Sequence, residues 1–355
     1  MEIMKIELKD ISYNIYIERN ILNTIGEYLS KNYSCKNIAI ITDENLEKLY
    51  GERINGAIKE KGFNTKVIAI KPGEESKNLD TLKEVYNELS EFKLSRTDLI
   101  IAFGGGVVGD LAGFAASTYL RGVQFIQIPT SLLAQVDSSI GGKVAVDLPS
   151  GKNLVGSFYH PRAVFIDPEL LRTLDKRFLH DGLAEVIKYG FIRNEDIIKL
   201  LLSYNNDDEL LNNIESVIYK CCSIKKVLVE RDEKDFGDRM LLNFGHTIGH
   251  AIEKYFDYKE YTHGEAVAIG MVEITKRSEE LNITKAGNLI ALEEVLKKYE
   301  LPCKAPQMDG KYILNSIALD KKVMGKKINL ILLKDIGEGF IEQVPINELE
   351  NYILL

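Results

Sequence analysis

The apolar run Leu99-Ile100-Ile101-Ala102-Phe103 leads directly into Gly104-Gly105-Gly106-Val107-Val108-Gly109-Asp110, and this stretch decides the fold. The run predicts a buried strand, and the small apolar residues from Leu111 to Ser117 predict a helix that begins on the glycine loop. Glycines leave the backbone N–H groups of the loop accessible to an anion, which the positive end of the helix also attracts. The stretch therefore predicts a strand–loop–helix unit that binds a phosphate group.

Polar residues that suit a phosphorylated, hydroxyl-rich ligand follow the next strand. This strand, Val123 to Ile128, ends in Pro129-Thr130-Ser131, and the segments Asp137 to Lys143 and Gly151 to Asn153 alternate glycines, hydroxyls and lysines. The spacing Gly104-x-Gly106-x-x-Gly109 matches the dinucleotide pattern, but no acid ends the next strand as that pattern requires. A tight turn that needs glycine is the alternative explanation of the triplet alone.

Strands and helices alternate through the first half of the chain. Apolar runs at Asn37 to Ile41 and Lys66 to Ile70 predict further strands, and Leu79 to Phe92 predicts an amphipathic helix. This order predicts a parallel sheet with helices on both faces. Asp43 follows one strand, so it is a candidate for a ribose hydroxyl or for a helix N-cap, and the two roles are compatible.

Composition narrows the functional classes. The 355 residues are 45% hydrophobic and 28% charged, which fits a globular protein of about two domains. A net charge of −8 argues against a nucleic-acid partner. We find no signal peptide and no apolar run that could span a bilayer, and none of the four cysteines forms a C-x-x-C pair. These features favour a cytoplasmic protein without a membrane partner.

Helical periodicity replaces the alternating pattern after about Asp175. We therefore expect an α/β domain over residues 1–174 and an all-α domain over residues 175–355. Within the second part, residues 328–333 follow a lysine-bearing loop and resemble a strand.

Three segments of the second part carry metal-binding residue types. Glu185 and Lys188 share one helical face, His246 and His250 are separated by one helical turn, and His263 lies in a third segment. One carboxylate and two imidazoles are a common catalytic zinc set. Spacing alone leaves open whether His246 ligates together with His250 or with His263.

Together these motifs resemble the 3-dehydroquinate synthase family over nearly the whole chain. The resemblance rests on 104–110, 137–143, 151–153, 183–188, 243–250 and His263-Gly264-Glu265. It implies an N-terminal Rossmann-like NAD-binding domain and a helical C-terminal domain. It also implies a phosphate-eliminating lyase of the shikimate pathway, which leads to the aromatic amino acids. Such an enzyme converts the sugar phosphate 3-deoxy-D-arabino-heptulosonate 7-phosphate to 3-dehydroquinate with catalytic NAD+ and Zn2+ or Co2+.

The resemblance also assigns residues and a homodimer. It implies the metal ligands Glu185, His246 and His263. It implies NAD+ contacts from Asp43, Pro72, Gly73, Glu74, Glu75, Ser76, Lys77, Gly105, Gly106, Val107, Val108, Gly109, Asp110, Thr130, Ser131, Lys143, Lys152, Leu170, Leu171, Arg172 and Thr173. It implies catalytic or substrate contacts from Asp137, Lys143, Lys188, Lys225, Arg239, Asn243, His250 and one of Lys321 and Lys322, with Arg121 lent to the neighbouring subunit. Thr130-Ser131 departs from the family's usual pair of threonines but keeps both hydroxyls.

Three alternative functions would differ from this one in their chemistry. Another sugar-phosphate cyclase would use a different phosphorylated sugar, and the segment Asp137 to Lys143 argues against it. A metal-dependent polyol dehydrogenase would release NADH. A metal- or nucleotide-binding regulatory module would release no phosphate.

Overall fold

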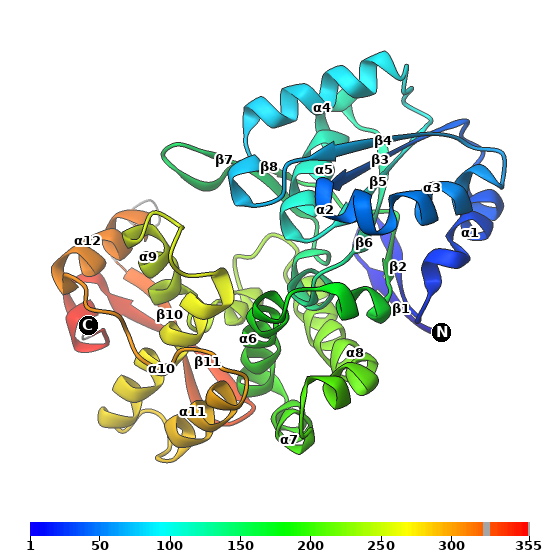
Figure 1. Cartoon of the computed structure of the whole chain (residues 1–355). Coiled ribbons are helices and arrows are strands. Elements are labelled where there is room, and N and C mark those ends of the chain that lie inside the picture. The colour runs from blue at the N-terminus through cyan, green and yellow to red at the C-terminus, as the bar shows by residue number, and fades with distance from the viewer. Residues whose placement is uncertain (322–326, 354–355) are drawn as a thin grey trace. The chain divides into compact units, whose positions relative to one another are not determined.

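The computed structural model describes residues 1–321 and 327–353, which form two compact units (Figure 1). The first unit contains Met1–Leu174 and Lys225–Lys234, and the second contains Asp175–Ile224 and Asp235–Leu355. The segment 225–234 therefore belongs to the first unit, although both of its neighbours in the sequence belong to the second.

A seven-stranded sheet organises the first unit. Its strand order is β1-β2-β9-β6-β5-β3-β4, and every neighbouring pair is parallel except β1 and β2. The strands are β1 (Glu2–Glu7), β2 (Ser12–Ile17), β3 (Asn37–Asp43), β4 (Asn64–Ile70), β5 (Leu99–Gly104), β6 (Gln124–Pro129) and β9 (Ala163–Ile166). Because β3, β4, β5 and β6 are parallel, their carboxyl ends and the loops that follow lie at one edge of the sheet.

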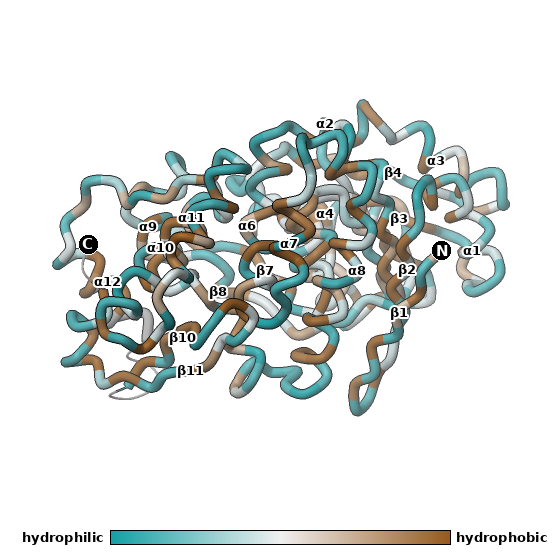
Figure 2. Tube along the Cα trace, turned by 90° about the horizontal axis from the view of Figure 1, so that it is seen from below, coloured by the Kyte–Doolittle hydropathy of each residue, from teal (hydrophilic) through white to brown (hydrophobic). Residues whose placement is uncertain are grey.

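Helices cover both faces of this sheet (Figure 1). On one face α1 (Ile25–Asn32) and α3 (Glu52–Lys59) pack over alternate strand residues such as Ile38 and Ile101. On the other face α4 (Leu79–Glu91) and α5 (Gly106–Thr118) pack over Ala39 and Ile100. Strands buried on both faces need continuous apolar sequence, and β3 is buried from Ile38 to Thr42, with hydrophobic colour along it in Figure 2.

A hairpin of β7 (Lys143–Leu148) and β8 (Gly151–Phe158) lies outside the main sheet. Val144 and Val146 of β7 are buried with α5 in one core. Gly113 of α5 permits this contact, because a Cβ there would lie 2.4 Å from Cγ1 of Val144. The sequence patterns indicated a ligand-binding segment here but no hairpin, because β8 has no buried residue and mixes polar with apolar residues.

The second unit is mainly helical. It contains α6 (Lys176–Arg193), α7 (Glu195–Ser203), α8 (Asp207–Arg231, whose last turns belong to the first unit), α9 (His246–Tyr255), α10 (His263–Glu280), α11 (Asn288–Lys298) and α12 (Gly310–Lys321). It also carries an antiparallel hairpin of β10 (Lys327–Asp335) and β11 (Glu338–Pro345). The expected strand at 328–333 is thus present, and this hairpin corrects the all-α expectation. Within the described ranges, we find no helix with the length and apolar character to cross a membrane.

Glycines bring α9 and α10 into close contact. A Cβ on Gly270 of α10 would lie 2.0 Å from the backbone oxygen of Gly245, and one on Gly249 would lie 3.1 Å from that of Ala266. Real Cβ atoms do not approach backbone at 2.0 Å, so only glycine fits at position 270. This packing sets the spacing of the two helices that carry the three clustered histidines.

Candidate nucleotide and metal sites

The glycine loop forms the start of α5 at the carboxyl end of β5. The N-cap of α5 is Gly105, whose position lacks any side chain that could cap the helix, so the first turn presents its N–H groups at this end. Cβ atoms on Gly105 and Gly106 would lie 3.3 Å from the hydroxyls of Ser131 and Ser138, respectively. The loop is therefore a narrow cradle of N–H groups and hydroxyls, which fits the pyrophosphate of a dinucleotide.

Neighbouring strand ends bring further predicted NAD+ residues to this edge. Thr130 follows β6 and donates its backbone N–H to the oxygen of Gly104 at 3.1 Å. Asp43 ends β3, and its carboxylate accepts N–H bonds from Asn45 (2.9 Å) and Leu46 (3.1 Å). The N-cap role predicted for Asp43 is thereby confirmed, and its contact with a ribose stays a prediction.

A buried lysine connects several predicted NAD+ residues. Lys77 is 4% exposed, and its Nζ lies 2.7 Å from Oδ2 of Asp110 and 2.6 Å from Oδ1 of Asn153. Glu74 is 3.7 Å from both Lys77 and Lys152. Burial opposes the charge of Lys77, but the carboxylates of Asp110 and Glu74 outweigh it and raise the pKa of Lys77 above its ordinary value. The lysine is therefore a fixed cation at this edge.

The remaining predicted NAD+ residues lie in two short turns and on the hairpin. Pro72–Lys77 follows β4, with a 3₁₀ turn at Glu74–Ser76. Leu170–Thr173 lies in a second 3₁₀ turn, Pro168–Thr173, where Thr173 Oγ1 is 2.8 Å from the hydroxyl of Tyr50. Lys143 begins β7 and is exposed, and Lys152 lies on β8.

Three helices of the second unit bring one carboxylate and two imidazoles together. Glu185 comes from α6, His246 from α9 and His263 from α10, and one ligand atom of each lies within 4.8 Å of the other two. Nε2 of His246 is 3.4 Å and Nε2 of His263 is 3.6 Å from the same oxygen, Oε1 of Glu185. The donor set suits a divalent metal such as zinc or cobalt, which binds imidazole nitrogen and carboxylate oxygen. A second group, His250, Glu253 and His263, meets the same distance criterion.

The two histidines differ in their electrostatics. Burial lowers the pKa of His246 to about 3, so its imidazole is neutral and able to ligate. Burial also acts to lower the pKa of His263, but hydrogen bonds to the carboxylates of Glu185 and Glu253 outweigh it and raise this pKa to about 10. A metal that binds His263 therefore has to displace a proton at neutral pH.

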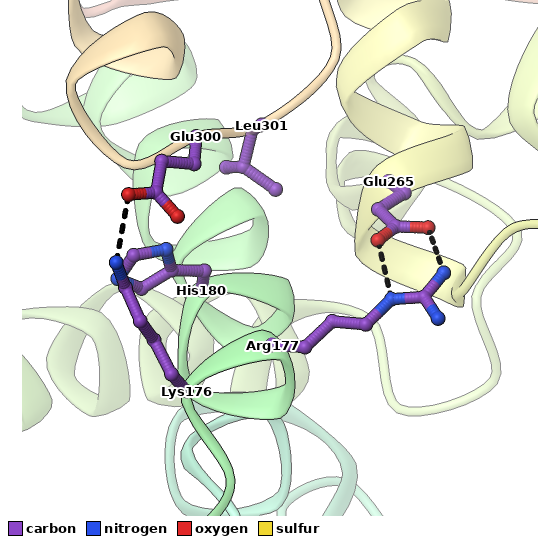
Figure 3. Close-up of a pocket in the computed structure, with 6 residues that line it drawn as sticks. All are labelled: Lys176, Arg177, His180, Glu265, Glu300 and Leu301. Atoms are coloured by element: carbon purple, nitrogen blue, oxygen red, sulfur yellow. Dashed lines mark hydrogen bonds and ion pairs between the residues drawn. The ribbon is translucent and has the colours of Figure 1, made fainter.

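Contacts between α6 and α10 hold Glu185 and His263 in register. The backbone N–H of Gly264 donates to Oδ1 of Asp181 at 2.6 Å, and a Cβ on Gly264 would lie 2.0 Å from the backbone oxygen of Asp181. Arg177 binds Glu265 through two hydrogen bonds of 2.7 and 2.8 Å, as Figure 3 shows. Planar two-bond pairs of this kind fix orientation as well as distance.

The cavity of Figure 3 has a volume of about 220 Å³ and is lined by Lys176, Arg177, His180, Glu265, Glu300 and Leu301. Lys176 pairs with Glu300 at 2.7 Å, and Arg177 pairs with Glu265. Because these charges pair across the cavity, they link α6 to α10 and to Glu300, which follows α11. The sequence predictions place no ligand there.

The predicted substrate residues fall into both units. In the second unit, Lys188 is 1% exposed and pairs with Glu185, Arg239 is 3% exposed, Asn243 ends the 3₁₀ turn Asp238–Asn243, and His250 is exposed. In the first unit, Lys225 is 4% exposed and bonds the backbone oxygen (2.6 Å) and Oδ1 (2.9 Å) of Asp137. Lys321 ends α12, its side chain is outside the description, and Lys322 lies outside the described residues.

Arg121, the residue expected to serve a neighbouring subunit, has an unusual backbone. Arg121 has φ = 66° and Leu120 has φ = 50°, two successive left-handed residues that are not glycine. Such conformations cost on the order of 1 kcal/mol or more each. Both side chains are exposed in this chain.

Glu253 and Asp147 contact predicted site residues, although the motifs did not single them out. Glu253 lies three residues after His250 and seven after His246, so the helical spacing alone placed it on their face. Asp147 accepts the backbone N–H of Asn153 at 2.7 Å and donates its own to the oxygen of Lys77 at 2.7 Å. It carries no sequence signal, because these contacts depend on the hairpin.

Comparison with known proteins identifies related chains. Residues 67–181 match the family model described as 3-dehydroquinate synthase N-terminal, and residues 182–323 match the one described as 3-dehydroquinate synthase C-terminal. The chain is 57% identical to 3-dehydroquinate synthase of Clostridium acetobutylicum over 99% of both chains.

Two solved structures share its fold. A 2-deoxy-scyllo-inosose synthase complexed with carbaglucose-6-phosphate, NAD+ and Co2+ has a TM-score of 0.86, with 26% identity over 99% of both chains. The 2-epi-5-epi-valiolone synthase of Streptomyces hygroscopicus subsp. jinggangensis 5008, with NAD+ and Zn2+ bound, has a TM-score of 0.86. It is 25% identical and covers 97% of this chain and 96% of its own.

Proposed function

The chain belongs to the 3-dehydroquinate synthase family, and we propose that it converts 3-deoxy-D-arabino-heptulosonate 7-phosphate into 3-dehydroquinate and phosphate. It is thus an enzyme, and we assign it to the lyases that eliminate phosphate during ring closure. The observation that carries the proposal is the meeting of Glu185, His246 and His263 from three separate helices.

We propose that Glu185, His246 and His263 hold one divalent ion, Zn2+ or Co2+. When bound, the ion supplies Lewis-acid polarisation of substrate hydroxyls. The residues around it perform two tasks. Lys188 pairs with Glu185 at a buried position, so it partly balances the carboxylate and keeps a cation beside the ion's ligands. The contacts of Arg177 and Asp181 fix the start of α10 and hence the ring of His263.

NAD+ is the proposed cofactor of the first unit. When bound, it supplies a hydride acceptor that is regenerated in each turnover, so the reaction has no net oxidation. The glycine loop and the start of α5 would bind its pyrophosphate, Asp43 a ribose, and Thr130 and Ser131 would donate hydroxyl hydrogen bonds. Lys77, held by Asp110, and Lys152 would keep positive charge beside the cofactor.

The substrate carries a carboxylate and a phosphate, and the proposed contacts match these charges. We assign Arg239, a planar two-bond donor, to the carboxylate. We assign Lys143, Asn243, His250 and one lysine of the pair Lys321-Lys322 to the phosphate. The hydroxyl groups between the two anionic ends would be bound by the pair Asp137 and Lys225 and by Lys188.

A homodimer in the cytoplasm completes the proposal. The strained backbone at Leu120 and Arg121 supports a role for Arg121 outside its own chain, because strained residues persist where function requires them. We expect Arg121 to complete the site of the partner subunit.

Release of inorganic phosphate from the heptulosonate phosphate tests the function. We expect release with NAD+ and metal, loss of release after chelation, and recovery on addition of Zn2+ or Co2+. Because the hydride returns, NADH should not accumulate as phosphate appears. A steady rise of NADH would indicate a dehydrogenase instead, and undiminished turnover in a chelated, metal-free sample would refute the metal assignment.

A further inference from the structure

Glu253 of α9 is a buried acid that the proposed reaction does not use. Its side chain is 3% exposed. Oε2 of Glu253 lies 3.5 Å from Nδ1 of His263, one of the proposed metal ligands. Acids are seldom buried without a partner, because desolvation of a carboxylate is costly. His263 supplies such a partner.

The helical register places Glu253 beside the metal ligands. His246, His250 and Glu253 are separated by four and then three residues, so they form one face of α9. Close packing of α9 and α10 at Gly249 and Gly270 brings this face to the start of α10, where His263 lies. Glu253 is therefore positioned by the same contacts that position His246.

The two ring nitrogens of His263 have different partners. Nε2 is 3.6 Å from Oε1 of Glu185, and Nδ1 is 3.5 Å from Oε2 of Glu253. His246 repeats the arrangement, with Nε2 3.4 Å from Glu185 and Nδ1 3.1 Å from the backbone oxygen of Phe244. A neutral imidazole carries its proton on one nitrogen and a lone pair on the other. An acceptor at Nδ1 thus leaves the lone pair of Nε2 available to a metal.

We propose that Glu253 is a positioning residue, which accepts a hydrogen bond from Nδ1–H of His263 and holds the ring with Nε2 toward the metal. The inference rests on the metal site of the proposed function. Carboxylates behind metal-binding histidines commonly fix the tautomer and strengthen binding. The competing possibility is that Glu253 itself ligates the ion with His250 and His263. In that arrangement Nδ1 of His263 is a ligand rather than a donor.

Titration of metal-depleted protein with Co2+ tests the proposal. Binding is followed by visible absorption, without NAD+ or substrate, so the readout is independent of turnover. We expect Glu253→Gln to bind Co2+ about 10- to 100-fold more weakly than the unaltered protein, with an unchanged spectral shape. Gln keeps an acceptor oxygen but loses the charge, whereas Ala loses both. We therefore expect Glu253→Ala to bind Co2+ more weakly than Glu253→Gln does.

Glu273→Gln is the matched control, because Glu273 is a half-buried acid on α10. Its carboxylate interacts with the charge of Lys276 and accepts a hydrogen bond from the backbone of Ala305. It should bind Co2+ as the unaltered protein does. Unchanged affinity in Glu253→Gln would overturn the proposal, as would a spectrum that reports a lost ligand.

The tautomer of His263 gives a test that needs no variant and remains available if Glu253→Gln fails to fold. In zinc-loaded protein with isotope-labelled histidine, nuclear magnetic resonance should find the proton of His263 on Nδ1 and the metal on Nε2. Metal on Nδ1 would refute the proposal. A failure of the phosphate-release assay would refute the proposed reaction and leave both of these measurements interpretable.

Discussion

At the scale of single residues, His246 and His263 present the same atom to Glu185 but differ in what lies behind them. A neutral carbonyl accepts from Nδ1 of His246, whereas the carboxylate of Glu253 lies at Nδ1 of His263. The carboxylates raise the pKa of His263, so in the metal-free chain this histidine keeps its proton at pH 7. Metal binding releases that proton, and the affinity for metal should therefore rise with pH.

Substitution of individual histidines tests the ligand set. We expect His263→Ala to lose metal, because it removes one of two imidazoles that face Glu185. His250→Ala should retain about one ion per chain, since His250 is exposed and belongs only to the second group. Metal analysis after gel filtration measures both. Stoichiometric metal in His263→Ala, or its loss in His250→Ala, would show that the assignment is wrong.

Residue spacing identified Glu185, His246, His250 and His263 as candidate metal ligands, but it did not show which two histidines bind the metal together with Glu185. Four-residue spacing put His246 and His250 on one face, and nothing in that spacing showed that a histidine from another helix approaches Glu185. The convergence depends on contacts between residues far apart in the chain, such as Asp181 with Gly264. The helical spacing placed Glu253 on the face of His246 and His250, but it could not show the contact with His263, which lies on a different helix.

At the scale of elements, glycines determine how closely helices pack. In the first unit, β3 and β5 were predictable because buried parallel strands are nearly continuous apolar runs. The hairpin β7–β8 was not predictable, since β8 lacks a clear alternation in its sequence and has no buried residue. In the second unit the decisive contact, Gly270 against Gly245, leaves no periodic signal at all.

A paired substitution tests the role of Gly270. Gly270→Ala would place a methyl group against the backbone of α9, and such overpacking typically costs about 1–3 kcal/mol in the free energy of unfolding. Gly56→Ala in α3 is the control, because its Cβ would meet nothing within 4 Å. There the lower entropy of the unfolded chain should give a gain of about 0.4–1 kcal/mol. Urea denaturation measures both, and equal stabilities would contradict this account of the packing.

At the scale of the whole molecule, an acidic chain buries a small set of cations. The net charge is −8, yet among the residues that the structure describes the buried lysines and arginine are Lys77, Lys188, Lys225 and Arg239. All four are assigned to NAD+ or to the substrate. Buried cations need anionic partners, and three of these four pair with carboxylates of the chain itself: Lys77 with Asp110, Lys188 with Glu185 and Lys225 with Asp137.

The division into units allows the two cofactor sites to be tested separately. The proposed NAD+ contacts lie in the first unit and the proposed metal ligands in the second. We expect Lys152→Ala to weaken NAD+ binding, because it removes a cation beside Glu74, while metal content stays unchanged. Calorimetric titration with NAD+ and metal analysis of the same sample would measure this. If Lys152→Ala also lost metal, the prediction that the NAD+ site and the metal site are independent would be contradicted.

The segment 225–234 has a consequence for synthesis on the ribosome. The first unit includes this segment, in which Lys225 bonds Asp137 and Glu233 lies 3.1 Å from His160. Domains generally fold as they emerge, from the N-terminus onward. Here the nascent first unit cannot be completed until residue 234 has been translated, and by then part of the second unit has already left the tunnel. A fragment that stops at Leu174 would lack these partners, so we expect its expression to yield an incompletely folded and aggregation-prone polypeptide.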